Sequence, residues 1–212
     1  MDIVKIKNFD EPNININEVY RYCGVKAPDS MLKKTVNECL KECEGVFKYS
    51  VCFTITSCDS LFENVESTLL KTRLKDCEKA VLFAATVGIG IDRLIEKYGR
   101  ISPSKALVFQ AIGAERIESL CDIFCDDLKK ENLFLTNRFS PGYGDFPLMC
   151  QKEIFSRLDC VKKIGLTLND SLVMSPSKSV TAVMGISDKF EMECENKCGT
   201  CDKTDCSFRR VI

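Results

Sequence analysis

Residues 138–147 hold the combination of side chains most suited to binding a small molecule, in the order Arg-Phe-Ser-Pro-Gly-Tyr-Gly-Asp-Phe-Pro. We call this segment the Arg138 loop. Asp145 and Pro147 are residue types that cap and begin a helix. A guanidinium at one end of the loop and free helix N–H groups at the other would suit a carboxylate. Tyr143 adds an aromatic face with a polar tip between them.

The backbone of the Arg138 loop is expected to be stiff. Pro141 fixes one φ angle and removes a hydrogen-bond donor, while Gly142 and Gly144 allow conformations that other residues avoid. An apolar run at residues 133–135 precedes the loop and an amphipathic run follows it, so the loop should join a strand to a helix. A tight turn with a solvated arginine would use the same residues, and both interpretations stay open at this point.

Four cysteines near the C-terminus have a spacing typical of metal ligands: Cys194, Cys198, Cys201 and Cys206. Such a dense group of thiols in polar surroundings is rarely core packing. Zinc in a four-sulfur site would form a structural clip or docking surface, whereas an iron–sulfur cluster could pass an electron. The spacing does not choose between the two metals, and a reactive or merely exposed thiol cluster is the alternative to both.

The chain contains no histidine and no tryptophan. Without histidine, Ser-His-Asp and Cys-His nucleophile systems, histidine zinc sites and histidine general bases are excluded. The remaining cysteines lie in apolar or amphipathic runs, as Cys39 and Cys43 do on one expected helix, and are interpreted as reduced core residues. Any chemistry must therefore use carboxylates, thiols, tyrosines or a ligand that is already reactive.

The bulk composition is that of an ordinary globular protein, with 212 residues, 45% hydrophobic and 29% charged. Thirty basic and 31 acidic residues nearly cancel, so nothing indicates a nucleic acid or an anionic membrane as a partner. The longest apolar run, residues 80–91, is too short to span a bilayer. Residues 1–7 lack the apolar core of a signal peptide. We therefore expect a cytoplasmic protein.

Hydrophobic periodicity predicts helices and strands that interleave irregularly. The expected strands are residues 1–12 in part, 47–55, 80–87, 133–135, 164–168, 172–174 and 180–186, and the expected helices begin near residues 17, 30, 69, 91, 102 and 147. This order predicts an α+β fold with a mixed, largely antiparallel twisted sheet flanked by helices, and a short Cys-rich C-terminal tail. We divide the chain into an N-terminal strand and helix region (1–45), a main domain (46–190) and a Cys-rich metal-binding tail (191–212).

Two further features each have a functional and a simpler explanation. Gly88 and Gly90 follow an expected strand, as in a phosphate-binding loop, but the third glycine of a dinucleotide fingerprint is missing. A crowded strand-to-helix turn explains the pair better. Glu115 and Glu118 lie on the long helix near its apolar face, although most helix glutamates are simply solvated.

Two stretches resemble the activation domain of cobalamin-dependent methionine synthase. Residues 138–143 resemble its R-x-x-P-G-Y signature. Residues 165–176 together with 178–180 resemble its G-x-x-L-T-x-S-x-x-M-x-P...S-V segment, at the spacing the family shows. Residues 84–88 and the long helix behind them are also similar to the family. The resemblance covers roughly residues 45–187 and makes 46–190 a methionine synthase activation-like domain.

The resemblance implies a domain that binds S-adenosylmethionine and takes part in the reductive remethylation of inactive cobalamin. The residues it assigns to the ligand are Arg138 for the carboxylate, Ser140, Pro141, Gly142 and Gly144 for the groove, and Tyr143 along the ligand. One acidic side chain should contact the ligand ammonium, and Glu115 and Glu118 are the candidates. The missing histidine fits this chemistry, because a sulfonium is already an activated methyl donor that the protein needs only to align.

The chain also departs from the family. No region resembles a folate, homocysteine or cobalamin domain, and Gly144 stands where the family often has a second proline. We therefore expect a stand-alone component of cobalamin-dependent methionine synthase, a methyltransferase of methionine biosynthesis. It would act in trans on a cobalamin-carrying partner, with an electron donor such as flavodoxin or ferredoxin. The alternatives are an activator of another corrinoid methyltransferase and a non-catalytic metal-binding interaction module.

Overall fold

A five-stranded antiparallel sheet forms the centre of the computed structural model, which describes residues 3–63, 65–131 and 133–187. In spatial order its strands are β1 (Lys5–Phe9), β2 (Tyr49–Ser57), β3 (Cys77–Thr86), β7 (Ser179–Ser187) and β4 (Phe134–Leu135). A separate hairpin pairs β5 (Thr167–Leu168) with β6 (Met174–Ser175). The prediction of an α+β fold with a largely antiparallel sheet is confirmed, whereas the Cys-rich tail lies outside the described residues.

The sheet separates two hydrophobic cores. Successive side chains of a strand point to opposite faces, so each strand can contribute residues to both cores. On β3, Val81, Phe83 and Ala85 face one core. The intervening Ala80, Leu82 and Ala84 face the other. A strand that must bury both faces reads as a continuous apolar run, which is the pattern of residues 80–87.

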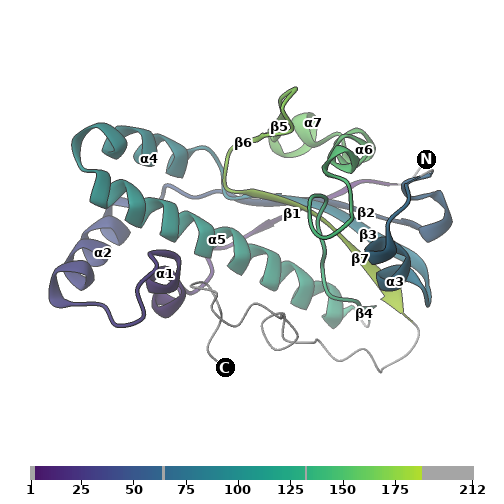
Figure 1. The fold of residues 1–212 in the computed structure, drawn as a ribbon, viewed down its shortest axis with the longest axis horizontal. Helices are drawn as coiled ribbons and strands as arrows, with labels where there is room; N and C mark the ends of the chain where they lie inside the picture. Colours follow the sequence, from purple (N-terminus) through teal and green to yellow (C-terminus); the bar gives the residue numbers. More distant parts are fainter. Residues whose placement is uncertain (1–2, 64, 132, 188–212) are drawn as a thin grey trace.

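Four helices cover the first face of the sheet (Figure 1): α1 (Ile16–Tyr22), α2 (Ser30–Glu42), α4 (Gly90–Ile101) and α5 (Pro103–Lys130). Helix α5 runs along the sheet, and its Phe124 ring lies 5.1 Å from that of Phe53 and 5.0 Å from that of Phe83. Pro103 begins α5, where the missing N–H costs nothing. The helix ends at Lys130, so its extent is the one that the apolar period predicts.

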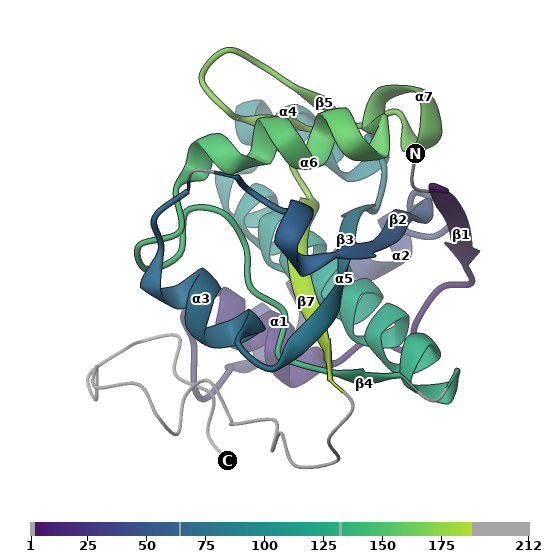
Figure 2. The same cartoon turned by 90° about the vertical axis from the view of Figure 1, so that its right-hand side faces the viewer.

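The second face is covered by shorter elements (Figure 2): α3 (Thr68–Leu74), α6 (Gln151–Leu158), α7 (Cys160–Ile164) and the Arg138 loop. Two 3-10 turns, η1 (Cys58–Ser60) and η2 (Leu148–Cys150), precede α3 and α6 along the chain. This face contributes most of the residues that surround the site described below.

The Gly88 and Gly90 pair forms a crowded strand-to-helix turn, as the sequence favours. Gly88 has φ +83°, a conformation that side chains disfavour. A Cβ atom on Gly90 would lie 2.4 Å from the carbonyl oxygen of Val46. The two glycines are therefore explained by packing.

Cys39 lies in α2 and Cys43 follows it as the C-cap, and both are buried thiols outside any disulfide. This agrees with the interpretation of reduced core residues. No helix within residues 3–187, apart from the undescribed positions 64 and 132, is long and apolar enough to cross a membrane.

Candidate ligand-binding site

The Arg138 loop is a tight turn held by its own backbone. The Gly142 N–H donates to the Phe146 carbonyl at 2.8 Å, and the Tyr143 N–H donates to the Ser140 carbonyl at 3.2 Å. Gly142 has φ +93°, which explains why glycine stands there. Phe146 is buried in the second core, so the loop is fixed by side-chain packing as well.

The start of the loop is joined to the edge of the sheet. Phe139 and Val183 of β7 exchange two backbone hydrogen bonds of 3.1 and 2.9 Å. In the part of the chain that the structure describes, no strand pairs with this edge of β7 between Val183 and Ser179. An open stretch of sheet edge therefore lies next to the loop.

The end of the loop corrects one expectation. Asp145 does not cap the helix that follows the loop, because the η2 turn intervenes and α6 begins only at Gln151. Instead, the Asp145 carboxylate accepts hydrogen bonds from the backbone of Leu69 at 3.0 Å and of Thr68 at 2.5 Å, and from the Ser67 hydroxyl at 2.8 Å. These bonds lower the pKa of Asp145 from 3.8 to about 2. Asp145 thus ties the Arg138 loop to the start of α3.

Arg138 reaches across to α5, where it forms two ion pairs. Its guanidinium donates to Glu118 at 2.7 Å and to Asp122 at 2.5 Å. The side chain of Arg138 is only 15% exposed, whereas those of Glu118 and Asp122 are 36% and 55% exposed. The guanidinium has five N–H groups, so these two bonds leave donors for a ligand.

Two thiols of α5 lie beneath Arg138. Burial raises the pKa of Cys121, and it also raises the pKa of Cys125, where the Arg138 charge offsets only part of the effect. Both groups are therefore protonated thiols at neutral pH and poor nucleophiles. This end of the site can bind and orient a ligand but carries no activated thiol.

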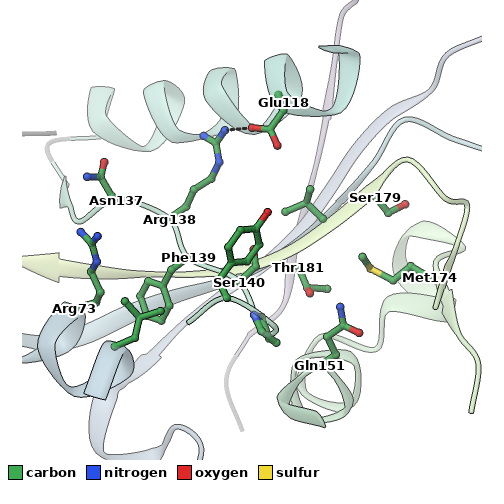
Figure 3. A pocket seen from close by; sticks show the side chains of 14 residues that line it. Arg73, Glu118, Asn137, Arg138, Phe139, Ser140, Gln151, Met174, Ser179 and Thr181 are labelled. Carbon is green, nitrogen blue, oxygen red and sulfur yellow. Dashed lines mark hydrogen bonds and ion pairs between the residues drawn. The ribbon is translucent and has the colours of Figure 1, made fainter. Parts of the chain in front are cut away.

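A cavity of about 480 Å³ lies between the Arg138 loop, α3, α5, α6 and β7 (Figure 3). This volume is within the range that small-molecule sites occupy. Its lining combines charged and polar residues with apolar ones, among them Leu69, Phe139 and Met174. In Figure 3, Arg73, Asn137 and Arg138 lie at one side of the cavity and Gln151 and Met174 at the other.

Two buried side-chain atoms in the cavity lining lack a hydrogen-bond partner. They are Oε1 of Gln151 and Oγ1 of Thr181, the only such atoms among the described residues. Gln151 is 6% exposed and Thr181 is 1% exposed. Buried polar groups without partners are costly and rare, so two of them around one cavity indicate a place for a polar ligand.

The structure brings together five of the residues that the sequence points to. Arg138, Ser140, Pro141, Tyr143 and Glu118 all line the cavity. Gly142 and Gly144 are not among its described lining residues and serve instead to shape the turn.

Glu115 occupies a different environment from Glu118, one turn away on α5. It is 2% exposed, pairs with Arg116 at 2.5 Å and accepts from the Asn15 N–H at 2.9 Å. This network holds the segment before α1 against α5. Of the two candidate acids, only Glu118 faces the 480 Å³ cavity. Both glutamates, however, border a second cavity of about 280 Å³ beside α1.

Sequence reasoning missed several lining residues. Arg73 of α3 has no ion-pair partner among the described residues, and nothing in the local sequence of α3 marks it. Thr181 could have been found from the sequence, because it places a hydroxyl within an otherwise apolar strand. Its side chain lies on the sheet face that also carries Val183 and Leu82. Gln151 begins α6, and the position of this helix beside the cavity could not be read from the sequence.

The four cysteines of the tail, Cys194, Cys198, Cys201 and Cys206, lie outside the described residues. The prediction of zinc or an iron–sulfur cluster there is untested. Within residues 3–187, leaving aside positions 64 and 132, no group of three or more His, Cys, Asp or Glu side chains is placed to hold a metal ion.

Comparison with known proteins finds similarity in structure and none in sequence. No protein-family model matches the chain, and no curated protein matches it by sequence. Among solved structures, the chain superposes on a crystal structure of the MetH reactivation domain bound to AdoHcy. The TM-score is 0.60 at 14% sequence identity, over 90% of this chain and 80% of that one.

The chain has the fold of the MetH reactivation domain. The resemblance drawn from the Arg138 loop and from residues 165–180 is thereby confirmed at the level of the fold. Because the sequence identity is only 14%, the match shows a shared fold, and the bound AdoHcy is a property of the MetH reactivation domain.

Proposed function

We propose that this chain binds S-adenosylmethionine in the 480 Å³ cavity and supports reductive methylation of a cobalamin carried by a separate methionine synthase. The observation that carries the proposal is the Arg138–Glu118 ion pair in the cavity lining, within a fold whose MetH relative is bound to AdoHcy. The buried polar atoms without partners support the same site.

The charged end of the cavity suits an amino-acid head group. A ligand carboxylate would take the remaining N–H groups of Arg138, with Arg73 as a second cation at the same side. The ligand ammonium would take Glu118. Because Glu118 and Asp122 already approach Arg138, this end carries both signs of charge and favours a zwitterion over a simple anion.

S-adenosylmethionine would supply a sulfonium-activated methyl group, which the partner's corrinoid accepts after one-electron reduction, leaving S-adenosylhomocysteine. The contribution of this chain is to bind, orient and partly dehydrate the ligand. The cavity opens beside Tyr143, whose side chain is 69% exposed. An open side is required if the methyl group is to reach a cofactor held by another protein.

The proposal is tested by calorimetric titration of the full chain with S-adenosylmethionine. We expect binding by the wild type and at least about a tenfold loss of affinity for Arg138→Ala, because a charge-assisted contact is removed. Arg157→Ala is the matched control, since Arg157 is also half-buried and ion-paired, to Glu153 at 2.8 Å, but does not line the cavity.

A wild-type chain that shows no binding at millimolar ligand would refute the proposal. Equal losses in Arg138→Ala and Arg157→Ala would also refute it, because the loss would then follow from destabilisation. Methyl transfer in trans is measured separately, as the S-adenosylmethionine-dependent change in the visible spectrum of a reduced corrinoid protein on adding this chain.

A further inference from the structure

Gln151 Oε1 and Thr181 Oγ1 are buried polar atoms without a partner among the described residues, and both border the same cavity. They come from two different elements, α6 and β7, and only the fold brings both to the lining of one cavity. Folding alone gives no reason to place two costly groups at one wall. A ligand that satisfies both would explain them.

The backbone next to Thr181 offers further hydrogen-bonding groups. Val183 uses its N–H and C=O to bind Phe139, and on an antiparallel strand every second residue presents both groups to the same edge. Thr181 is two residues from Val183, so its N–H and C=O face the same edge. No described strand covers that edge between Val183 and Ser179.

The chemistry of these groups restricts what can bind. Gln151 Oε1 only accepts, so it requires an N–H or O–H donor, whereas the Thr181 hydroxyl and backbone can both donate and accept. Met174 and Phe139 provide apolar surface around them. A flat group with donors and acceptors on its edge fits this arrangement, and the charged head group is accommodated at the opposite side, near Arg73 and Arg138.

We propose that Gln151 and Thr181 form a subsite that holds the nucleoside part of the ligand and thereby sets the direction in which the ligand lies in the cavity. This inference rests on the proposed function, because it divides one ligand between the two sides of the cavity. It assigns two specificity residues that lie outside the Arg138 loop.

The test uses the full chain and three probes: S-adenosylmethionine, 5′-methylthioadenosine, which lacks the amino-acid part, and methionine, which lacks the nucleoside. Thr181→Val and Gln151→Leu are expected to weaken binding of the two nucleoside probes by about 5- to 10-fold each, the value of one hydrogen bond to a buried group. Binding of methionine should not change. Thr181→Ser keeps the hydroxyl and should restore most of the affinity.

The melting temperature provides a second readout. If the Thr181 hydroxyl had a structural role, its removal would lower the melting temperature. Thr181→Val should leave the ligand-free melting temperature unchanged or raise it, because no hydrogen bond is lost. The matched control is Thr54→Val, at a hydroxyl that is also buried but donates to the Ile3 carbonyl at 3.1 Å. That variant should melt at a lower temperature and bind the probes normally.

Two results would overturn the subsite while leaving the proposed function intact. One is wild-type affinity of Thr181→Val and Gln151→Leu for 5′-methylthioadenosine. The other is a melting temperature of Thr181→Val that falls as that of Thr54→Val does, since the hydroxyl would then have a partner in the protein. If the wild type binds neither nucleoside probe, the proposed function fails and the subsite fails with it.

Discussion

Arg138 shows how far residue types and spacing can lead and where they stop. The position of the guanidinium beside a stiff, glycine-containing turn could be predicted from residues 138–147. Its partners could not, because Glu118 and Asp122 lie on α5 and approach Arg138 only when α5 packs beside the loop. Likewise, Glu115 and Glu118 are equivalent in the sequence and differ in the structure by what faces them.

The two glutamates should respond differently to the same substitution. Glu118→Gln removes the proposed partner of the ligand ammonium and should weaken S-adenosylmethionine binding by about tenfold, with a small effect on stability. Glu115→Gln leaves the buried Arg116 charge without its carboxylate and should lower the free energy of unfolding by about 3 kcal/mol.

Titration calorimetry and denaturant unfolding of both variants check this. Normal affinity in Glu118→Gln, or full stability in Glu115→Gln, would contradict the assignment of the ligand site to one glutamate and of the structural network to the other.

At the scale of elements, the sequence predicts what depends on local pattern. The α5 helix agrees with its hydrophobic period, and the β2, β3 and β7 strands agree with their apolar runs, because each pattern matches the faces that the element buries. The prediction that Asp145 caps the helix after the loop was wrong for a physical reason. A capping carboxylate binds whichever free N–H groups are nearest, and here those belong to α3, far away in sequence.

The Asp145 cap should give the protein a specific acid sensitivity. The folded-state pKa of Asp145, about 2, is below its ordinary 3.8, so the stabilisation is complete above pH 4 and is lost as the pH falls towards 2. Asp145→Asn removes the charge and should lower the melting temperature at pH 7 by about 2–4 °C.

The measurement is the melting temperature of both proteins between pH 2 and pH 6. The difference between wild type and Asp145→Asn should shrink below pH 4. A difference that stays constant across this range would show that the Asp145 charge does not contribute to the cap.

At the scale of the whole molecule, the central sheet joins segments that we assigned to different parts of the chain. We divided the chain at residues 45 and 190, and this division remains a prediction. Strand β1 pairs with β2 along its whole length, from Lys5 opposite Phe53 to Phe9 opposite Tyr49. Val19 of α1 and Val36 of α2 belong to the same core as α5.

Removal of residues 1–45 should therefore prevent the remainder from folding cooperatively, because it uncovers one face of the first core and the edge of β2. We expect the truncated chain to lose near-ultraviolet circular dichroism and to bind a hydrophobic dye. A truncated chain that melts in one sharp transition near the wild-type temperature would instead support the division at residue 45.

The anchoring of the Arg138 loop at both ends has a consequence for the kinetics of ligand uptake. Phe139 is bonded to β7 and Asp145 to α3 before any ligand arrives, so one wall of the cavity is already in place. The entropy cost of ordering this wall is incurred when the chain folds and does not recur each time a ligand binds. Capture should then be limited by diffusion and orientation, and release by the strength of the contacts formed.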